Sequence, residues 1–471
     1  MVINNSQSTT VTNADALARQ LEIAYGLPAG SLRITNIVIR GITTKAGSGR
    51  RRRRELYRTK PPTCSDNLKN QDETDVDCGG SCAANGKKCQ NDQMCKRPSD
   101  CISDACASRG QCVVPCTAIF TGPTNYAAGS GTYSVAVADL NRDTKPDIIG
   151  PNDMAGTISI LLNRGDGTYN PQVVYTTGGT ASHPEGVTAS DLNGDGNLDI
   201  IVANYGANNI GIFMGTGVGT YAPQVAVATG AGSGPQAVAA SDVNGDGNAD
   251  IIVANFDGNK VGVFLGTGHG TFSPQVTYPT DAGSRPRSVV VADLNDDNKG
   301  DIIVANREGS YVAVFFNKGD GTFYPQVKYS TGAGSWPRSV VVADVNGDGT
   351  LDVIVANSRT NNVGIFLNKG DGTLATQTTL PTDPLPRAVT VADINDDGKI
   401  DILYISSAND NFGLYCNTGN GIFVLQGPYA VGAGSSPYGI AAADLNGDGK
   451  IDIVVGNHGT NNVGVFKTAC N

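Results

Sequence analysis

The sequence predicts a mainly β fold, in which a seven-bladed β-propeller follows a small disulfide-rich module and a short α/β fragment. Three observations lead to this prediction. A unit of about 51 residues recurs seven times, the chain contains 61 glycines, and nine of its 11 cysteines lie between Cys64 and Cys116. Short apolar segments separated by glycine-rich turns are typical of β-strands, and dense cysteines in a short stretch are typical of a disulfide-stapled module.

The repeats are marked by stretches such as "DVNGDGTLDVIVAN", and their leading aspartates are Asp139, Asp191, Asp242, Asp293, Asp344, Asp393 and Asp444. Each copy has four segments of strand character, which in the fifth copy include "RSVVVAD", "LDVIVAN" and "NVGIFLN". Because these runs are apolar almost throughout, we expect strands covered on both faces. Four-stranded sheets repeated radially form a propeller. The alternative at this period, a solenoid, would need capping repeats, which the seventh copy does not show.

The two ends of the repeat array predict how the ring closes. The seventh copy stops after its third strand, "NNVGVFKTACN", and the segment before the first copy, "CTAIFTGPTNYAAGSG", has the position of a fourth strand. We therefore expect the propeller to span residues 116–471, with its N-terminal strand completing the last blade and removing an open edge. In repeat register Cys116 and Cys470 fall on one hairpin turn, so we predict a disulfide between them. Cys416 is expected to be a buried free thiol.

Two smaller regions precede the propeller. Residues 61–115 form the predicted disulfide module, whose pairing the sequence leaves open and whose cysteines are Cys64, Cys78, Cys82, Cys89, Cys95, Cys101, Cys106 and Cys112. Residues 1–60 form the α/β fragment, with a helix in "ADALARQLEIAY" and a strand in "SLRITNIVIRG". Five arginines, Arg50 to Arg54, are interpreted as a solvated loop; the alternatives are a processing site and a polyanion patch.

The amino-acid composition indicates the cellular compartment. The cysteine density indicates an oxidising compartment, so we expect an extracellular, secreted or cell-surface protein, and Asn4-Asn5-Ser6 is a potential glycosylation site. No run of eighteen apolar residues exists, so no membrane span is predicted. The polar segment after Met1 lacks a signal sequence, and we expect the natural N-terminus to lie upstream.

Each repeat contains a loop of the pattern Asp-x-Asn-x-Asp-Gly-x-x-Asp. Side-chain oxygens at positions 1, 3, 5 and 9, with the backbone carbonyl of position 7, would surround a hard cation, and Gly at position 6 permits the sharp turn. We predict Ca²⁺, in up to seven sites, over Mg²⁺, which prefers stricter octahedra. The alternative is a set of metal-free Asx turns, but three carboxylates in each loop would then repel one another. The predicted metal residues are Asp139, Asn141, Asp143, Lys145, Asp147, Asp191, Asn193, Asp195, Asn197, Asp199, Asp242, Asn244, Asp246, Asn248, Asp250, Asp293, Asn295, Asp297, Lys299, Asp301, Asp344, Asn346, Asp348, Thr350, Asp352, Asp393, Asn395, Asp397, Lys399, Asp401, Asp444, Asn446, Asp448, Lys450 and Asp452.

The seven loops are not equivalent. Position 6 is Gly in five copies, Asn298 in the fourth and Thr144 in the first. A β-branched residue is costly at positive φ, so the first site is expected to be distorted or the weakest. The ligand pattern accounts for 21 of the 44 acidic residues. The formal charge of −10 therefore says little about partners, and no nucleic-acid partner is expected.

The chemistry of an enzyme is not predicted. The three histidines, His183, His269 and His458, fall at loop or turn positions of the repeat, and none has a recognisable nucleophile context. The tripeptide Arg164-Gly165-Asp166 matches the hairpin turn "NKGDGTF" of other copies, so it is interpreted as structural.

The stretch "DLNGDGNLDIIVAN…NNIGIFMGTGVGTYAPQV" resembles the FG-GAP/VCBS repeat, the unit of the integrin α-subunit propeller and of many secreted proteins. The resemblance covers about residues 116–471. It implies a seven-bladed propeller with Ca²⁺ in the strand 1–2 loops of one face. It also implies ligand binding, where present, on the opposite face or between blades. The resemblance does not specify a ligand.

Loops on the face opposite to the aspartates carry aromatic and arginine side chains, which suit recognition of glycans or acidic protein surfaces. The predicted ligand-binding residues are Trp336, Arg285, Arg287, Arg338 and Tyr205. For Trp336 the alternative is packing between adjacent loops. We predict a structural or adhesive extracellular module, which could act as a self-associating subunit of a surface fibre or matrix. A lectin-like propeller and an accessory domain of a larger secreted protein are the alternatives.

Overall fold

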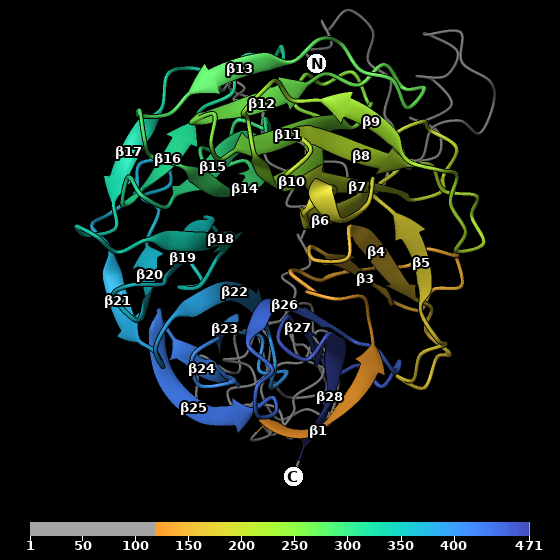
Figure 1. Cartoon of the computed structure of the whole chain (residues 1–471). Helices are drawn as coiled ribbons and strands as arrows, with labels where there is room; N and C mark the ends of the chain where they lie inside the picture. The colour runs from red at the N-terminus through yellow and green to blue at the C-terminus, as the bar shows by residue number, and fades with distance from the viewer. Residues whose placement is uncertain (1–117, 471) are drawn as a thin grey trace, which may run out of the picture. The chain divides into compact units, whose positions relative to one another are not determined.

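The computed structural model describes residues 118–470, which form a ring of seven four-stranded antiparallel sheets (Figure 1). The predicted seven-bladed β-propeller is therefore confirmed. The predictions for residues 1–60, for the cysteine module at 61–115 and for Cys116 lie outside the described residues. No helix in the described part of the chain has the length and apolar character needed to cross a membrane.

Each copy of the repeat supplies the strands of one blade, and the strands of a blade are numbered first to fourth from the axis outward. The first strands are β2 (Ala136–Ala138), β6 (Pro184–Ser190), β10 (Pro235–Ser241), β14 (Pro286–Ala292), β18 (Pro337–Ala343), β22 (Pro386–Ala392) and β26 (Pro437–Ala443). The second strands are β3 (Asp147–Asn152), β7 (Asp199–Asn204), β11 (Asp250–Asn255), β15 (Asp301–Asn306), β19 (Asp352–Asn357), β23 (Asp401–Ser406) and β27 (Asp452–Asn457). The third strands are β4 (Thr157–Leu161), β8 (Asn209–Phe213), β12 (Lys260–Phe264), β16 (Tyr311–Phe315), β20 (Asn362–Phe366), β24 (Asn411–Gly419) and β28 (Asn462–Cys470). The fourth strands are β5 (Val173–Thr176), β9 (Val225–Ala228), β13 (Val276–Pro279), β17 (Val327–Ser330), β21 (Thr378–Pro381), β25 (Ile422–Ala430) and β1 (Ala118–Ala127). A one-turn 3₁₀ helix, η2 (Thr180–Ser182), precedes β6.

Burial changes across each blade. Every residue of the second strands is buried, as in β19, and the third strands are buried over nearly their whole length. The fourth strands are mostly exposed, as in β17. The expectation of strands covered on both faces is therefore confirmed for the two middle strands. The outermost strand has solvent on one side because no further strand covers it.

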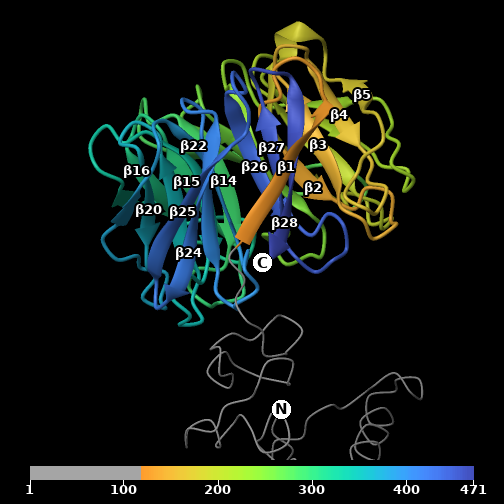
Figure 2. The ribbon, with the colours of Figure 1, turned by 90° about the horizontal axis from the view of Figure 1, so that it is seen from below.

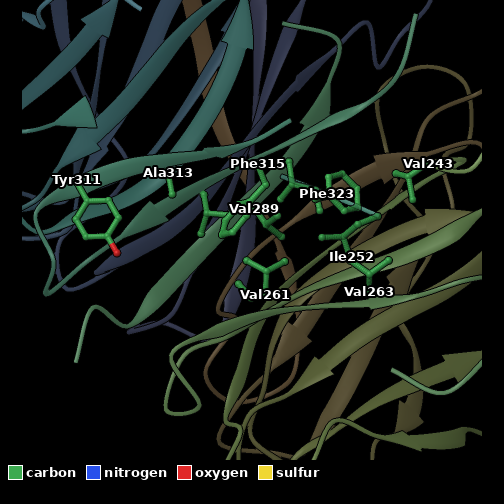
Figure 3. Packing of buried hydrophobic residues seen from close by; sticks show 12 residues of the cluster. Val243, Ile252, Val261, Val263, Val289, Tyr311, Ala313, Phe315 and Phe323 are labelled. Atoms are coloured by element: carbon green, nitrogen blue, oxygen red, sulfur yellow. The ribbon is translucent and has the colours of Figure 1, made fainter. Parts of the chain in front are cut away.

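Apolar contacts between neighbouring blades form the core. Seven buried clusters each join two adjacent blades, and one of them lies between the third and fourth blades (Figure 3). In that cluster Ile252 and Val263 of the third blade pack against Val289 and Phe315 of the fourth. Burying one such side chain contributes roughly 1.5–3 kcal/mol. Because every blade shares its core with both neighbours, the stability of each sheet depends on an intact ring.

The ring closes through strand β1, as the sequence predicts. β1 pairs antiparallel with β28, from Ala118 opposite Cys470 to Ala127 opposite Asn462, and Figure 2 shows the two strands side by side. Phe120 packs edge-on against Phe412 of the sixth blade, with ring centroids 5.2 Å apart. The first described strand thus completes the last blade and also contacts the blade before it. The Cys116–Cys470 disulfide remains a prediction.

The prediction for Cys416 is confirmed. Its thiol is free and buried, with 6% of the residue exposed. Burial raises the pKa of this thiol to about 12, with a smaller contribution from the nearby Asp401 carboxylate. A thiol with such a high pKa is a poor nucleophile at neutral pH, which agrees with a structural role.

Candidate functional site

The aspartate loops run from the end of each first strand to the start of the second, so all seven lie on one rim of the ring. In the fifth blade the Gly349 amide donates to Asp344 Oδ2 at 2.8 Å, and the Asp348 amide donates to Asn346 Oδ1 at 2.9 Å. Asn346 Nδ2 also donates to Asp348 Oδ2 at 2.8 Å. The side chains of positions 1, 3 and 5 are thereby gathered within one turn, and their oxygens are the ligand type that hard cations prefer.

Position 6 adopts the left-handed conformation in every loop, which explains the preference for glycine. The five glycines have φ between 79° and 88°, while Asn298 has φ 62° and Thr144 has φ 66°. The Thr144 amide donates to Asp139 Oδ2 at 2.8 Å, as the glycine amides do in other copies. The first loop therefore keeps the common shape, and the expected distortion is confined to strain at Thr144. Weaker metal binding by this loop stays a prediction.

The aspartates at position 9 are fully buried and have a structural role that the sequence did not predict. Asp352 Oδ2 accepts a hydrogen bond from the Val345 amide at 3.1 Å, and its Oδ1 accepts one from the Asn368 amide at 2.8 Å. The corresponding two bonds occur in all seven blades. These carboxylates hold the start of each loop to the end of the third strand. The pKa of Asp352 is raised to about 6, mainly by burial and to a smaller extent by the charges of Asp348 and Asp344.

The donor set of the loops fits a cation only in part. Within residues 118–470 no three acidic, cysteine or histidine side chains are grouped in a way that would hold a metal ion. A cation would therefore depend on asparagine and backbone oxygens as well as on carboxylates. In the first, fourth and sixth blades the lysine at position 7 also places Nζ 3.1–3.4 Å from the carboxylate at position 5. These three loops already contain a positive charge, whereas the second, third and fifth have Asn197, Asn248 and Thr350 there.

The opposite rim holds a cavity of about 200 Å³, which we call the axial cavity. It is lined by the first strands of six blades and, in the first blade, by the residues just before β2. In every blade one of the lining residues stands six positions before the leading aspartate of the loop. These side chains are Tyr133, Glu185, Gln236, Arg287, Arg338, Arg387 and Tyr438. Because the first strands run from this rim to the aspartate rim, the two sites lie at opposite ends of the same strands.

Hydrogen bonds and ring contacts orient most of the cavity side chains. Arg287 Nη1 donates to Gln236 Oε1 at 2.6 Å, and its Nη2 donates to the Tyr133 hydroxyl. Arg387 lies over the Tyr438 ring, with Cζ 3.7 Å from the ring centroid. Tyr133 and Tyr438 meet edge-to-face at 5.2 Å. Arg338 differs, because its buried Nε has no hydrogen-bond partner in the described part of the chain.

Only two of the five predicted ligand-binding residues, Arg287 and Arg338, line the axial cavity. Arg285 lies over the Phe256 ring at 5.3 Å, and Tyr205 meets the same ring at 6.4 Å, so these residues pack together on the rim. The Trp336 ring lies between two arginine side chains whose Cζ atoms are 4.3 and 4.8 Å from its centroid. This is the packing between adjacent loops that was the alternative for Trp336.

Five cavity residues were not predicted from the sequence, namely Tyr133, Glu185, Gln236, Arg387 and Tyr438. A signal for them was present, because all seven positions precede a leading aspartate by six residues. Aligning the seven copies at that position would have identified these seven residues as one set.

The remaining sequence motifs have structural roles. Asp166 of the Arg-Gly-Asp tripeptide accepts a hydrogen bond from the Thr168 amide at 2.8 Å in a hairpin turn. The fourth blade repeats this bond between Asp320 and Thr322 at 2.9 Å, so the structural interpretation is confirmed. His458 stacks on the Tyr438 ring at 4.4 Å.

Comparison with protein families identifies the repeat. A model described as FG-GAP-like repeat matches residues 146–202, 191–253, 242–304, 293–355, 344–404 and 393–455. These six overlapping matches cover more than half of the chain and follow the spacing of the blades.

Curated relatives match about half of the chain. Cartilage acidic protein 1 of Homo sapiens is 27% identical over 272 residues, which is 48% of this chain and 39% of the relative. The protein of the same name from Mus musculus is 26% identical over 267 residues, which is 48% of this chain and 40% of the relative. The chain therefore matches about two-fifths of the length of each relative.

Solved structures share the fold. A streptogramin B lyase superposes with a TM-score of 0.55 at 16% identity, covering 74% of this chain and 98% of the lyase. Virginiamycin B lyase from Staphylococcus aureus gives a TM-score of 0.52 at 16% identity, covering 74% of this chain and 99% of that protein. At such identities the likeness concerns the propeller architecture alone.

Proposed function

Since the chain belongs to the FG-GAP-like repeat family, we propose that it is a non-enzymatic, extracellular, calcium-binding propeller that serves as a structural or adhesive module. The observation that carries this proposal is the set of seven aspartate loops on one rim of a closed ring. Each loop gathers carboxylate and amide oxygens within one turn. The extracellular setting is supported by the relatives, which are named for cartilage, and by the dense cysteines of residues 64–116.

Calcium would be held by the side chains of positions 1, 3 and 5 and by the carbonyl of position 7. When bound, the ion would supply positive charge between carboxylates that otherwise repel one another. The position 9 carboxylate would support the loop through its two amide hydrogen bonds. We expect the second, third and fifth loops to bind most tightly, because they have Gly at position 6 and no lysine at position 7.

A structural role follows from the rigidity of the ring. Each blade shares a buried cluster with both neighbours, and β1 closes the circle. Loops held by such a frame keep a fixed arrangement, which suits repeated contacts in a fibre or matrix. Calcium on one rim would stiffen that face for assembly.

Calcium binding is tested by titrating Ca²⁺ into the calcium-depleted protein and measuring the heat of binding by calorimetry. Wild type is expected to bind several ions, and Asp348→Asn is expected to bind one fewer because it removes a charge from the fifth loop. The matched control is Asp371→Asn, an exposed aspartate in the hairpin turn of the same blade. Equal stoichiometry in wild type and Asp348→Asn would contradict the assignment of this loop.

The assembly role is tested by electron microscopy and sedimentation of the secreted protein with and without EGTA. Ordered oligomers or filaments that dissociate on chelation are expected. A protein that stays monomeric at high concentration with calcium would refute the assembly role, and selective retention on glycans would then favour a lectin.

A further inference from the structure

Three arginines from consecutive blades converge on the axial cavity. Arg287, Arg338 and Arg387 occupy the same position of the first strand in the fourth, fifth and sixth blades. We propose that this cavity is a binding site for a carboxylate group, with Arg338 as the principal ligand-binding residue. This inference goes beyond the proposed function, because it concerns the opposite rim and does not depend on calcium or on assembly.

The charges that line the cavity are unbalanced. Three guanidinium groups face one carboxylate, Glu185, which is 7% exposed. Within residues 118–470 none of the three arginines forms an ion pair with an aspartate or glutamate. Glu185 Oε1 accepts a long hydrogen bond of 3.5 Å from Gln236 Nε2, and its Oε2 has no hydrogen-bond partner within 3.5 Å among the described residues. Interaction with the Tyr133 side chain gives its charge some further stabilisation. Buried charges are costly unless they are paired, so an anion entering the cavity would gain interactions that the protein does not provide.

Arg338 is the guanidinium that the protein leaves available. Arg287 is held by Gln236 and Tyr133. Arg387 donates from Nε to Ser407 Oγ at 2.7 Å. These contacts fix two positive charges beside Arg338, whose own buried Nε is unpartnered. A site with its charges already oriented loses little conformational entropy when a ligand binds.

Electrostatics agrees with this geometry. Burial lowers the pKa of Arg338 well below its usual value, and the charges of Arg287 and Arg387 lower it further. Burial also raises the pKa of Glu185 to about 7, so this carboxylate neutralises the cluster incompletely near neutral pH. A bound anion would relieve the repulsion among the arginines.

The cavity favours a carboxylate over an inorganic oxyanion. A planar guanidinium matches the two oxygens of a carboxylate. The walls also include the apolar side chains of Ala388, Val389 and Ile440, which would contact the methylene groups of an aspartate, a glutamate or a small dicarboxylate. Sulfate offers no apolar surface to them. The volume of about 200 Å³ admits one such group rather than an extended chain.

The test is calorimetric titration of the full chain with glutarate, with a glutamate-rich peptide and with sulfate at matched ionic strength. We expect saturable one-to-one binding of at least one carboxylate ligand and weaker binding of sulfate. Trp336 is the single tryptophan of the chain and lies on this rim, so its fluorescence provides a second readout. Tighter binding of the peptide would identify a protein partner as the source of the carboxylate, and equal binding of glutarate would identify a free small acid.

Variants distinguish binding at the axial cavity from non-specific attraction to the charge of the protein. Arg338→Met is expected to weaken carboxylate binding at least about tenfold, the loss for a charge-assisted pair. Its melting temperature without ligand should equal or exceed that of wild type, because a buried unpaired charge is removed. Glu185→Gln should tighten binding. Arg164→Gln, which changes an exposed arginine of a hairpin turn on the aspartate rim, is the charge-matched control and should bind as wild type does.

Three results would overturn the proposal. These are no saturable carboxylate binding by wild type, sulfate binding as tight as that of the carboxylates, or an equal loss in Arg338→Met and Arg164→Gln. None of them would bear on calcium binding at the opposite rim.

Discussion

The hydrogen bonds of Asn317 predict a large cost for a single substitution at the interface of two blades. Asn317 follows β16, and only 3% of its surface is exposed. Its Nδ2 donates to the Val243 carbonyl of the third blade at 2.8 Å and to the Gly300 carbonyl of its own blade at 2.9 Å. Its Oδ1 accepts from the Gly319 amide at 2.7 Å. This one side chain thus connects two neighbouring aspartate loops and a hairpin turn.

Asn317→Ala removes all three side-chain bonds and leaves two carbonyls and one amide without their partner. A net hydrogen bond contributes about 1 kcal/mol, and an unsatisfied buried group costs roughly 1–3 kcal/mol. Some of these groups will regain water, so we expect a loss of about 2–4 kcal/mol in the free energy of unfolding. The backbone amide of residue 317, which donates to Asp301, is unchanged by the substitution.

The assay is equilibrium unfolding in urea, followed by circular dichroism and by tryptophan fluorescence, so that coincident transitions establish two-state behaviour. The control is Asn170→Ala, which removes an exposed asparagine that accepts one bond from Arg164 at 2.8 Å. Surface changes of this kind usually stay within about 0.5 kcal/mol. A loss below about 1 kcal/mol for Asn317→Ala, or a loss equal to that of the control, would refute the argument that these bonds connect the blades.

Three further predictions concern pH, backbone strain and ring closure. The raised pKa of Glu185, about 7, means that the folded protein binds a proton more tightly than the unfolded chain. Glu185 alone should therefore contribute a loss of up to about 3 kcal/mol of stability as pH rises from about 4.5 to 7, and Glu185→Gln should lack this component in unfolding measured across pH. Thr144→Gly should raise the unfolding free energy by about 1 kcal/mol by relieving strain at φ 66°, and the reciprocal Gly349→Thr should lower it; similar signs for both would disprove the strain. Phe120→Ala should cost about 1–3 kcal/mol by removing its contact with the sixth blade, whereas exposed Thr124→Ala in the same strand should be neutral in the same denaturation assay.

Much of the fold was predictable because its determinants are local and repeated. The spacing of the leading aspartates predicts seven blades, and the missing fourth strand of the last copy predicts the pairing of β1 with β28. The need for glycine at position 6 follows from the left-handed φ of that residue, which depends on only a few neighbouring residues. Cys416 was predictable as buried because it replaces an apolar residue in repeat register.

The candidate sites were less predictable, since their geometry depends on contacts between distant segments. Asp352 has the sequence context of a metal ligand, and its role as one stays a prediction. The structure adds that its carboxylate oxygens accept amides of the loop and of the segment after the third strand. Which oxygens face a cation is decided by the packing of three strands, and the loop pattern does not contain that information. The same holds for Trp336, whose two arginine neighbours come from other loops.

The sequence by itself thus determined the number of blades, the strand order, the closing strand and the loops that must turn sharply, because each depends on a repeated local pattern. Only the tertiary structure decided that Glu185, Arg287, Arg338 and Arg387 share one cavity. These residues are between 49 and 102 positions apart along the chain, and they meet because closure of the ring brings corresponding positions of the repeat to the axis. Each copy of the repeat contains the residues that determine its own turns and strands. Side chains from different copies come into contact only once the ring has closed.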